Sequence, residues 1–229
     1  MAFNEKLKKE INDYCNNHLP EEDWYENEFD FIQNESLRNR IIKEFRSIRF
    51  AYKLYEGLGA SEENLLFEIR SQILAYASIY EAIITYILTT YYSDTLEYDD
   101  LTHHIIPVKI SISNSSKKLL QSSLCHNGEE VVPMTYRKKE KEERQIRFDD
   151  KCDTAVKLGL IHPYIKDGYE INFPEEIKTI YSYRNAIHLL AEQRKSLHYD
   201  LEMSITAYKR MQPFVKQIKE KLLADGKIT

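Results

Sequence analysis

The sequence predicts an all-α protein: a bundle of five or more helices with an irregular insertion, in part short β structure, around residues 100–147. Three observations predict this class. Apolar residues recur at i, i+3 and i+4 along most of the chain, which is the period of amphipathic helices. Only six Gly and six Pro occur in 229 residues, too few for a turn-rich β architecture. The 42% hydrophobic and 30% charged content is that of a globular chain. We expect a single domain over residues 1–229, with residues 1–58 as additional N-terminal helices.

Three helices are expected before residue 93. The apolar period places them at about residues 3–15, 35–58 and 62–92. Pro20 ends the first, and Gly57 and Gly59 end the second. Ser61 followed by Glu62 and Glu63 is typical of a helix start. The third helix is apolar on nearly all sides but interrupted by polar residues, so we expect it in the core of the protein and not in a membrane.

The stretch from residue 105 to 147 has no sustained helical period. Residues 105–112 alternate weakly, which predicts a short strand or an extended link, and 131–136 is expected to be extended. A short helix is expected at 117–125 and a turn at 126–130. The run 137–147 holds six basic and three acidic residues. Two interpretations of it stay open: a solvated helix or mobile excursion, which is the common behaviour of such runs, and a patch that faces RNA.

The C-terminal part is expected to hold three more helices. The first spans 148–160 and ends at Gly159, and a loop with Pro163 and a turn at Asp167-Gly168 follows. The second begins at Pro174, with acids in its first turn, and continues to about Lys195. The last runs from about residue 200 to 224, with a kink expected at Pro213.

The helix after Pro174 carries an unusual pair of polar residues. Its apolar stripe contains Arg184 and His188, which stand at i and i+4 and point about 40° apart, so both can reach one point in space. Burying a guanidinium and an imidazole without partners is costly. An acid, a partner subunit or a ligand phosphate must therefore meet them, and the planar fork of Arg suits phosphate oxygens.

These residues resemble the HEPN superfamily. The resemblance rests on Arg184-Asn185-x-x-His188, on Leu-Gly-Leu-Ile at 158–161, and on the long apolar helix with its embedded acid Glu81. It covers roughly residues 60–92 and 148–222. HEPN proteins are helical bundles that usually dimerise. Many are metal-independent endoribonucleases of toxin–antitoxin, abortive-infection and other antiviral systems, and others are non-catalytic RNA-binding or scaffold modules. Four to six residues separate Arg from His in the family signature, whereas three do so here. A second Arg-x-x-x-His, at Arg194 and His198, lacks the Asn and ranks behind the first.

The resemblance implies RNA cleavage by attack of a 2′-hydroxyl, with no metal or other cofactor. His188 would transfer protons, Arg184 would stabilise the phosphorane, and Asn185 would orient the phosphate. Glu81 and Tyr181 would support them, Glu81 as the counter-charge. One His per subunit suggests that two subunits face each other in a homodimer, and a cognate antitoxin or regulatory protein is an expected partner. The alternative is a non-catalytic helical dimer, a binding or regulatory module in which Arg184 and His188 hold an interface or form a structural pair with an acid.

Charge and cysteine content limit the other classes of function. The net charge of −5 argues against a protein that binds nucleic acid over its whole surface, but leaves a local basic patch open. Cys15, Cys125 and Cys152 are far apart and form no CxxC pair, which disfavours a disulfide scaffold or zinc site and favours a cytoplasmic protein. His103 and His104 are adjacent in an extended link and point to opposite sides, so we expect no metal there.

Overall fold

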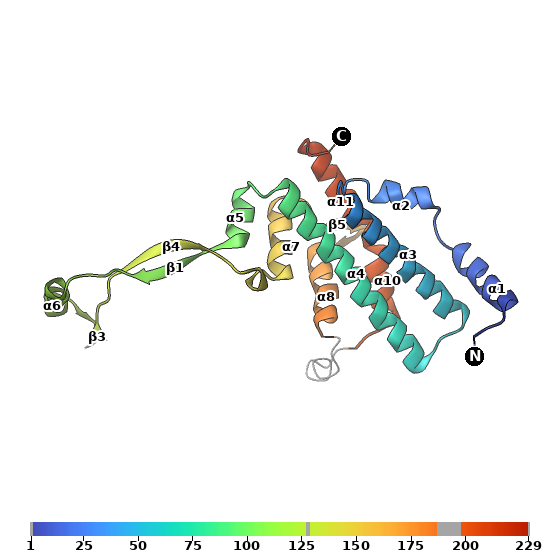
Figure 1. The fold of residues 1–229 in the computed structure, drawn as a ribbon, viewed down its shortest axis with the longest axis horizontal. Helices are drawn as coiled ribbons and strands as arrows, with labels where there is room; N and C mark the ends of the chain where they lie inside the picture. The colour runs from blue at the N-terminus through green and yellow to red at the C-terminus, as the bar shows by residue number, and fades with distance from the viewer. Residues whose placement is uncertain (1, 127–128, 187–197, 229) are drawn as a thin grey trace. The chain divides into compact units, whose positions relative to one another are not determined.

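The chain divides into two compact units in the computed structural model, which describes residues 2–126, 129–186 and 198–228 (Figure 1). The first unit comprises Met1–Ser93 and Phe148–Thr229, and the second is Asp94–Arg147. Helices dominate the first unit, and paired strands occur in the second, close to the expected insertion at 100–147. The predicted class, mostly helical with a short-β insertion, is confirmed at this level.

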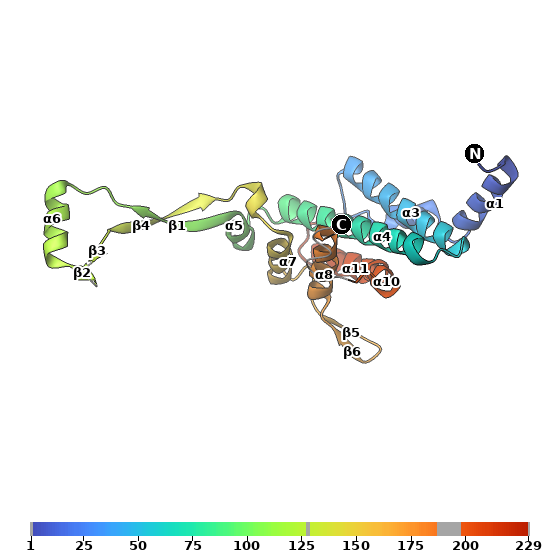
Figure 2. The same cartoon turned by 90° about the horizontal axis from the view of Figure 1, so that it is seen from below.

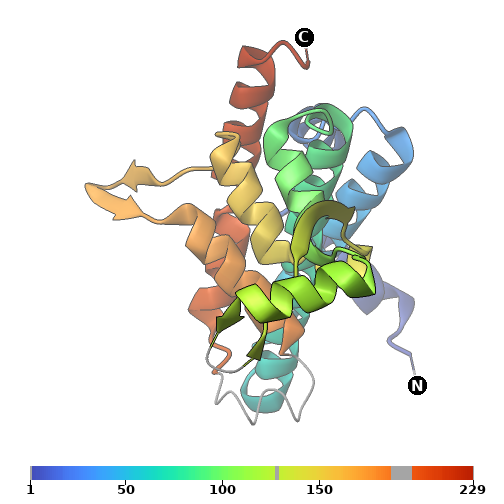
Figure 3. The same ribbon diagram turned by 90° about the vertical axis from the view of Figure 1, so that its left-hand side faces the viewer.

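The long helix α4 is the centre of the first unit. Helices α3, α7, α8 and α10 all pack on it, and in Figure 3 the blue α3 and the orange α8 lie on opposite sides of the green α4. The helices of this unit are α1 Glu5–Asn16, α2 Glu22–Glu28, α3 Glu35–Gly57, α4 Glu62–Tyr91, α7 Phe148–Lys157, α8 Phe173–Asn185, α10 Leu201–Lys209 and α11 Met211–Ala224. The expected helices at 3–15, 35–58 and 62–92 are thus confirmed within a few residues.

The buried side of α4 is rich in isoleucine and tyrosine, and two of its buried tyrosines bond to backbone carbonyls of other segments. The Tyr80 hydroxyl donates to the carbonyl oxygen of Ala207 at 2.8 Å, and the Tyr91 hydroxyl donates to that of Phe31 at 3.0 Å. A buried hydroxyl without a partner would cost free energy, so these bonds fix which helix each ring faces. By length and composition α4 also qualifies as a membrane-spanning helix, a test that core helices pass too, and half of its most apolar window is buried here.

Two elements of the first unit differ from expectation. The last predicted helix is not one kinked helix but two, α10 and α11, separated at Arg210. Pro213 lies in the first turn of α11, where its ring cannot coexist with a helical carbonyl at Lys209, so the helix breaks there instead of bending. Helix α2 was not predicted; its Tyr25 is buried against the ring of Phe45, a contact from a distant segment.

The segment 161–172, expected to be a loop, contains a small hairpin. Strands β5 Tyr164–Lys166 and β6 Tyr169–Ile171 pair antiparallel (Figure 2). Asp167 and Gly168 both have positive φ, 53° and 81°, as the tightest hairpin turns require. The turn signal was therefore right, whereas strands of three residues are too short to show a period.

The second unit is built on a two-stranded antiparallel ladder. Strand β1 His103–Lys109 pairs with β4 Met134–Glu140, with His103 opposite Glu140 and Lys109 opposite Met134. The remaining elements are α5 Leu96–Thr102, α6 Asn114–Ser123, β2 Cys125–His126, β3 Glu129–Glu130 and the 3-10 turn Glu143–Gln145. In Figures 1 and 2, α6 lies beyond the end of the ladder that is remote from α5.

The charged run 137–147 is not the solvated helix that was one interpretation of its charge. Its first four residues are strand, and their partners are Ile106, Ile105, His104 and His103. The expectation was wrong because the partner strand lies about thirty positions earlier in the chain, and a local charge pattern holds no information about such pairing.

Helix α8 ends at Asn185, not near Lys195. Ala186 caps it with non-helical angles, and its N–H bonds to the carbonyl oxygen of Tyr183 at 3.0 Å. The rest of the predicted helix, including His188 and Arg194, lies outside the described residues.

Candidate functional site

Three of the predicted site residues meet where α4 packs on α8. The Tyr181 hydroxyl donates a hydrogen bond to Glu81 Oε1 at 2.9 Å. Arg184 donates through Nη1 to that hydroxyl at 2.8 Å, and its Nη2 lies 3.5 Å from Glu81 Oε2. Each member thus contacts both others, and we call this group the Arg184 cluster.

The cluster sits where the apolar face of α8 ends. Ile177 and Ile180 are buried, and Tyr181 and Arg184 follow at the border with solvent. The Tyr181 ring stacks on Phe148 of α7, with centroids 4.0 Å apart and planes inclined by 29°. This packing fixes the direction of the Tyr181 hydroxyl, which is the acceptor for Arg184.

Tyr181 keeps its proton at neutral pH. Burial raises the pKa of Tyr181 to about 12, and the hydrogen bond to the Glu81 carboxylate acts in the same direction. A hydroxyl that stays protonated can donate to Glu81 while it accepts from Arg184. It therefore orients the guanidinium and is not itself a base.

The described residues orient the guanidinium of Arg184 but do not saturate it. About a third of its side chain is exposed, 32%, as is 29% of Glu81. The 3.5 Å separation exceeds the 2.7–2.9 Å of a charge-assisted hydrogen bond. Its contacts with Tyr181, Glu81 and, at 3.5 Å, Asn185 Oδ1 engage at most three of its five N–H donors among the described residues. At least two of its N–H donors are therefore not engaged by any described residue.

Two residues beside the cluster were not predicted. Phe148 supports the Tyr181 ring, and Lys151 of α7 donates to Thr85 Oγ1 on α4 at 3.0 Å, one turn after Glu81. No local pattern marks either one, since both reach α4 and α8 only because α7 packs there.

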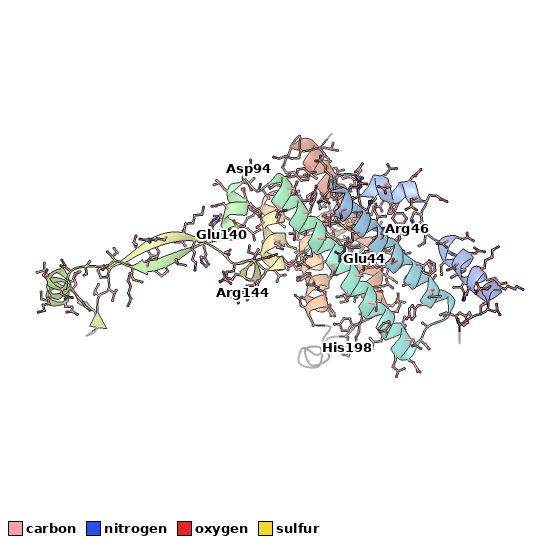
Figure 4. The ribbon with its side chains drawn as sticks, in the orientation of Figure 1. Glu44, Arg46, Asp94, Glu140, Arg144 and His198 are labelled. Atoms are coloured by element: carbon pink, nitrogen blue, oxygen red, sulfur yellow. The ribbon has the colours of Figure 1, made fainter. Side chains whose placement is uncertain are left out.

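The other candidates fare differently. Asn185 is the exposed last residue of α8. His198 is exposed as well (Figure 4). The convergence of His188 with Arg184 stays a prediction because His188 lies outside the described residues.

Within the described ranges no three His, Cys, Asp or Glu side chains come together as a metal site would require. His103 Nδ1 lies 3.2 Å from Asp99 Oδ1, a pair and not a ligand set. Cys152 is buried, and burial raises the pKa of its thiol far above the usual range, so it stays an unreactive thiol.

A cavity of about 510 Å³ lies elsewhere in the first unit, between β6, α8 and α10. Five acidic residues line it: Glu170, Glu175, Glu176, Asp200 and Glu202. Such a lining disfavours phosphate, so we do not assign RNA binding to this cavity.

Comparison with family models, with curated proteins and with solved structures found no match. The HEPN resemblance accordingly remains an interpretation of the motif residues.

Proposed function

We propose that the chain is a HEPN-like, metal-independent endoribonuclease of a defence or toxin–antitoxin system that acts in the cytoplasm. The observation that supports this most is that the guanidinium of Arg184 is both held in place and partly exposed. Tyr181 and Glu81 hold it in place, a third of it is exposed, and the described residues leave N–H donors that a phosphate would accept from. A preorganised cation of this kind is what a developing phosphorane charge needs.

The proposed reaction assigns one role to each motif residue. His188 takes the proton of an RNA 2′-hydroxyl or returns one to the leaving 5′-oxygen, which suits an imidazole near neutral pH. Arg184 stabilises the negative charge of the phosphorane, and Asn185 orients the phosphate. Glu81 and Tyr181 touch neither substrate atom; they position Arg184.

Cleavage by this route needs both an acid and a base, and the Arg184–His188 motif supplies one histidine per chain. We therefore propose a homodimer that brings two motifs into one cleft, with residues 174–195 at or near the interface. An uncontrolled ribonuclease would harm its own cell, so a cognate antitoxin or regulatory protein is the proposed partner.

The test is incubation of the purified protein with total tRNA and mRNA in the presence of a chelator. His188→Ala should lower the cleavage rate by ~10²–10⁴-fold, the usual effect of losing an acid–base group. Arg184→Ala should also lower it, whereas His198→Ala, an exposed histidine of the second Arg-x-x-x-His, should not. Cleavage that requires magnesium, or that survives His188→Ala, would overturn the mechanism.

The Arg184–Glu81 pair favours a second candidate, a non-catalytic binding or regulatory dimer. An arginine already beside an acid can serve packing alone. This candidate predicts that no RNA is cut under any condition, and that Arg184→Ala changes the melting temperature or the dimer mass in light scattering.

A further inference from the structure

The second unit contains an exposed two-stranded ladder, and no third described strand pairs with it. Strands β1 and β4 pair only with each other within the described residues. Two strands alone are marginally stable in water, so such a ladder usually gains stability from something that covers it. We call the described residues of 103–140, which contain this ladder and α6, the arm. Figure 4 shows their side chains projecting from both sides of the ladder, with Glu140 at its α5 end.

One face of the ladder combines apolar and basic side chains. The register sets Ile105 opposite Lys138, Pro107 opposite Tyr136 and Lys109 opposite Met134, and alternate positions place all six on one face. Ile105 and Tyr136 are each 72% exposed. We call this the Tyr136 face; it presents one aromatic ring between aliphatic neighbours, with lysines beside them.

The arm is basic in an otherwise acidic protein. Residues 103–140 hold six Lys or Arg and three Glu, whereas the whole chain has 32 basic and 37 acidic residues. Lys138 pairs with Asp99, but Lys109, Arg137 and Lys139 make no ion pair with a described residue. This positive charge is therefore available to an external anion.

The mixture of side chains distinguishes between partners. Interfaces with other proteins are depleted in lysine, so a lysine-bearing face argues against a protein partner. A partner that offered only phosphates would account for the exposed Lys and Arg side chains, but not for an exposed Tyr among aliphatic residues. Unstacked nucleotides account for both the basic side chains and the exposed Tyr, because nucleobases stack on aromatic rings while the phosphates bind Lys and Arg. Duplex RNA conceals its bases in a deep, narrow groove and fits less well.

We propose that the arm binds single-stranded RNA, with a base stacked on Tyr136 and a phosphate held by Lys109 on the same face, while Arg137 on the opposite face of the ladder adds to the positive charge that attracts the strand. The proposal rests on the arm alone and does not depend on whether the Arg184 cluster cleaves RNA.

The experiment measures binding of a short fluorescent oligouridine to the full chain by anisotropy, in a His188→Ala background so that cleavage plays no part. Lys109→Glu/Arg137→Glu should weaken binding at least tenfold and make the affinity less dependent on salt between ~50 and ~200 mM. Lys9→Glu/Lys43→Glu is the matched control, since it makes the same charge change at exposed positions of the first unit. Its affinity should stay much closer to that of the parent.

Stacking is tested separately. Tyr136→Ala should weaken binding by about tenfold. Tyr136→Phe should keep the affinity of the parent because a phenyl ring still stacks. Tyr169→Ala removes an equally exposed tyrosine, 77% exposed, from the β5–β6 hairpin and should have no effect. Circular dichroism confirms that each variant is folded.

Three results would overturn the proposal. The arm variants and their controls could bind RNA alike, or duplex RNA could bind as tightly as the single strand. Light scattering could instead show that the arm variants lower the mass of the protein while RNA binding is unchanged, which would identify a second copy of the chain as the occupant.

Discussion

The Tyr181 hydroxyl and Glu81 Oε1 lie 2.9 Å apart, joining α8 to α4 across one hundred positions of sequence. Since the same hydroxyl accepts from Arg184, the orientation of the guanidinium depends on a tyrosine that itself carries no charge. The raised pKa of Tyr181 keeps this relay in one protonation state through the neutral range.

The first prediction concerns this hydroxyl. Tyr181→Phe keeps the stacking on Phe148 but removes a donor to Glu81 and an acceptor for Arg184. We expect the free energy of unfolding to fall by about 1–2 kcal/mol in urea titration. In a double-mutant cycle, Tyr181→Phe and Glu81→Gln should be non-additive by at least about 0.5 kcal/mol. Tyr183→Phe, on the same helix and without a described hydroxyl bond, serves as the control; strict additivity would contradict the relay.

The periodicity of the sequence was enough to predict much of this site. It placed Tyr181 and Arg184 on one stripe, whereas Glu81 was proposed as their counter-charge through the HEPN resemblance, as the acid embedded in the long apolar helix. The stacking on Phe148 could not be predicted in the same way. It depends on where α7 packs, and the period of apolar residues within one helix does not predict which other helix packs on it.

In the fold, too, elements with a long local period were predicted, and those that depend on distant contacts were not. Long helices such as α3 and α4 were predicted to within about a residue because each repeats its period many times. The pairing of β1 with β4 was missed, since strand register depends on contacts between distant segments. Short elements such as α2 and β5 offer too few residues to establish any period.

A second prediction tests the proposed dimer. Light scattering should give twice the chain mass of 27.2 kDa at micromolar concentration. Because the interface is proposed near residues 174–195, Asn185→Arg, at the exposed end of α8, should lower that mass by adding a charge there. Asn114→Arg, at the start of α6, is the control and should leave the mass unchanged. A monomer at all concentrations would refute the dimer.

The third prediction concerns the pair that joins α8 to the end of α10. Arg210 binds both oxygens of Glu176, at 2.5 and 3.0 Å, and only 15% of the Arg210 side chain is exposed. Arg210→Met should lower the free energy of unfolding by about 2 kcal/mol, less than for a fully buried pair because Glu176 is a third exposed. Lys216→Met breaks an exposed pair with Glu220 and should change it by no more than about 0.5 kcal/mol. Equal effects in denaturant titration would contradict this assignment.

The last prediction starts from a carboxyl group inside the bundle. Glu68 of α4 is 2% exposed, and its Oε1 has no hydrogen-bond partner among the described residues. Burial raises the pKa of Glu68 to about 7, although the nearby Arg49 acts in the opposite direction. The ionised form is thus disfavoured in the folded state. Between about pH 4.5 and pH 7 the folded protein binds a proton that the unfolded chain has lost, so stability falls as pH rises through this window.

Glu68→Gln removes this ionisation. The variant should match the parent near pH 4.5, where the carboxyl is protonated in the folded state, and should exceed it at pH 8 by up to about 3 kcal/mol, the free energy of the pKa shift. Urea titrations at several pH values measure the difference. Glu63→Gln changes an exposed acid in the first turn of the same helix and should leave the pH dependence of the parent intact. If the parent and Glu68→Gln lose stability in parallel between pH 5 and pH 8, Glu68 is not the group that titrates.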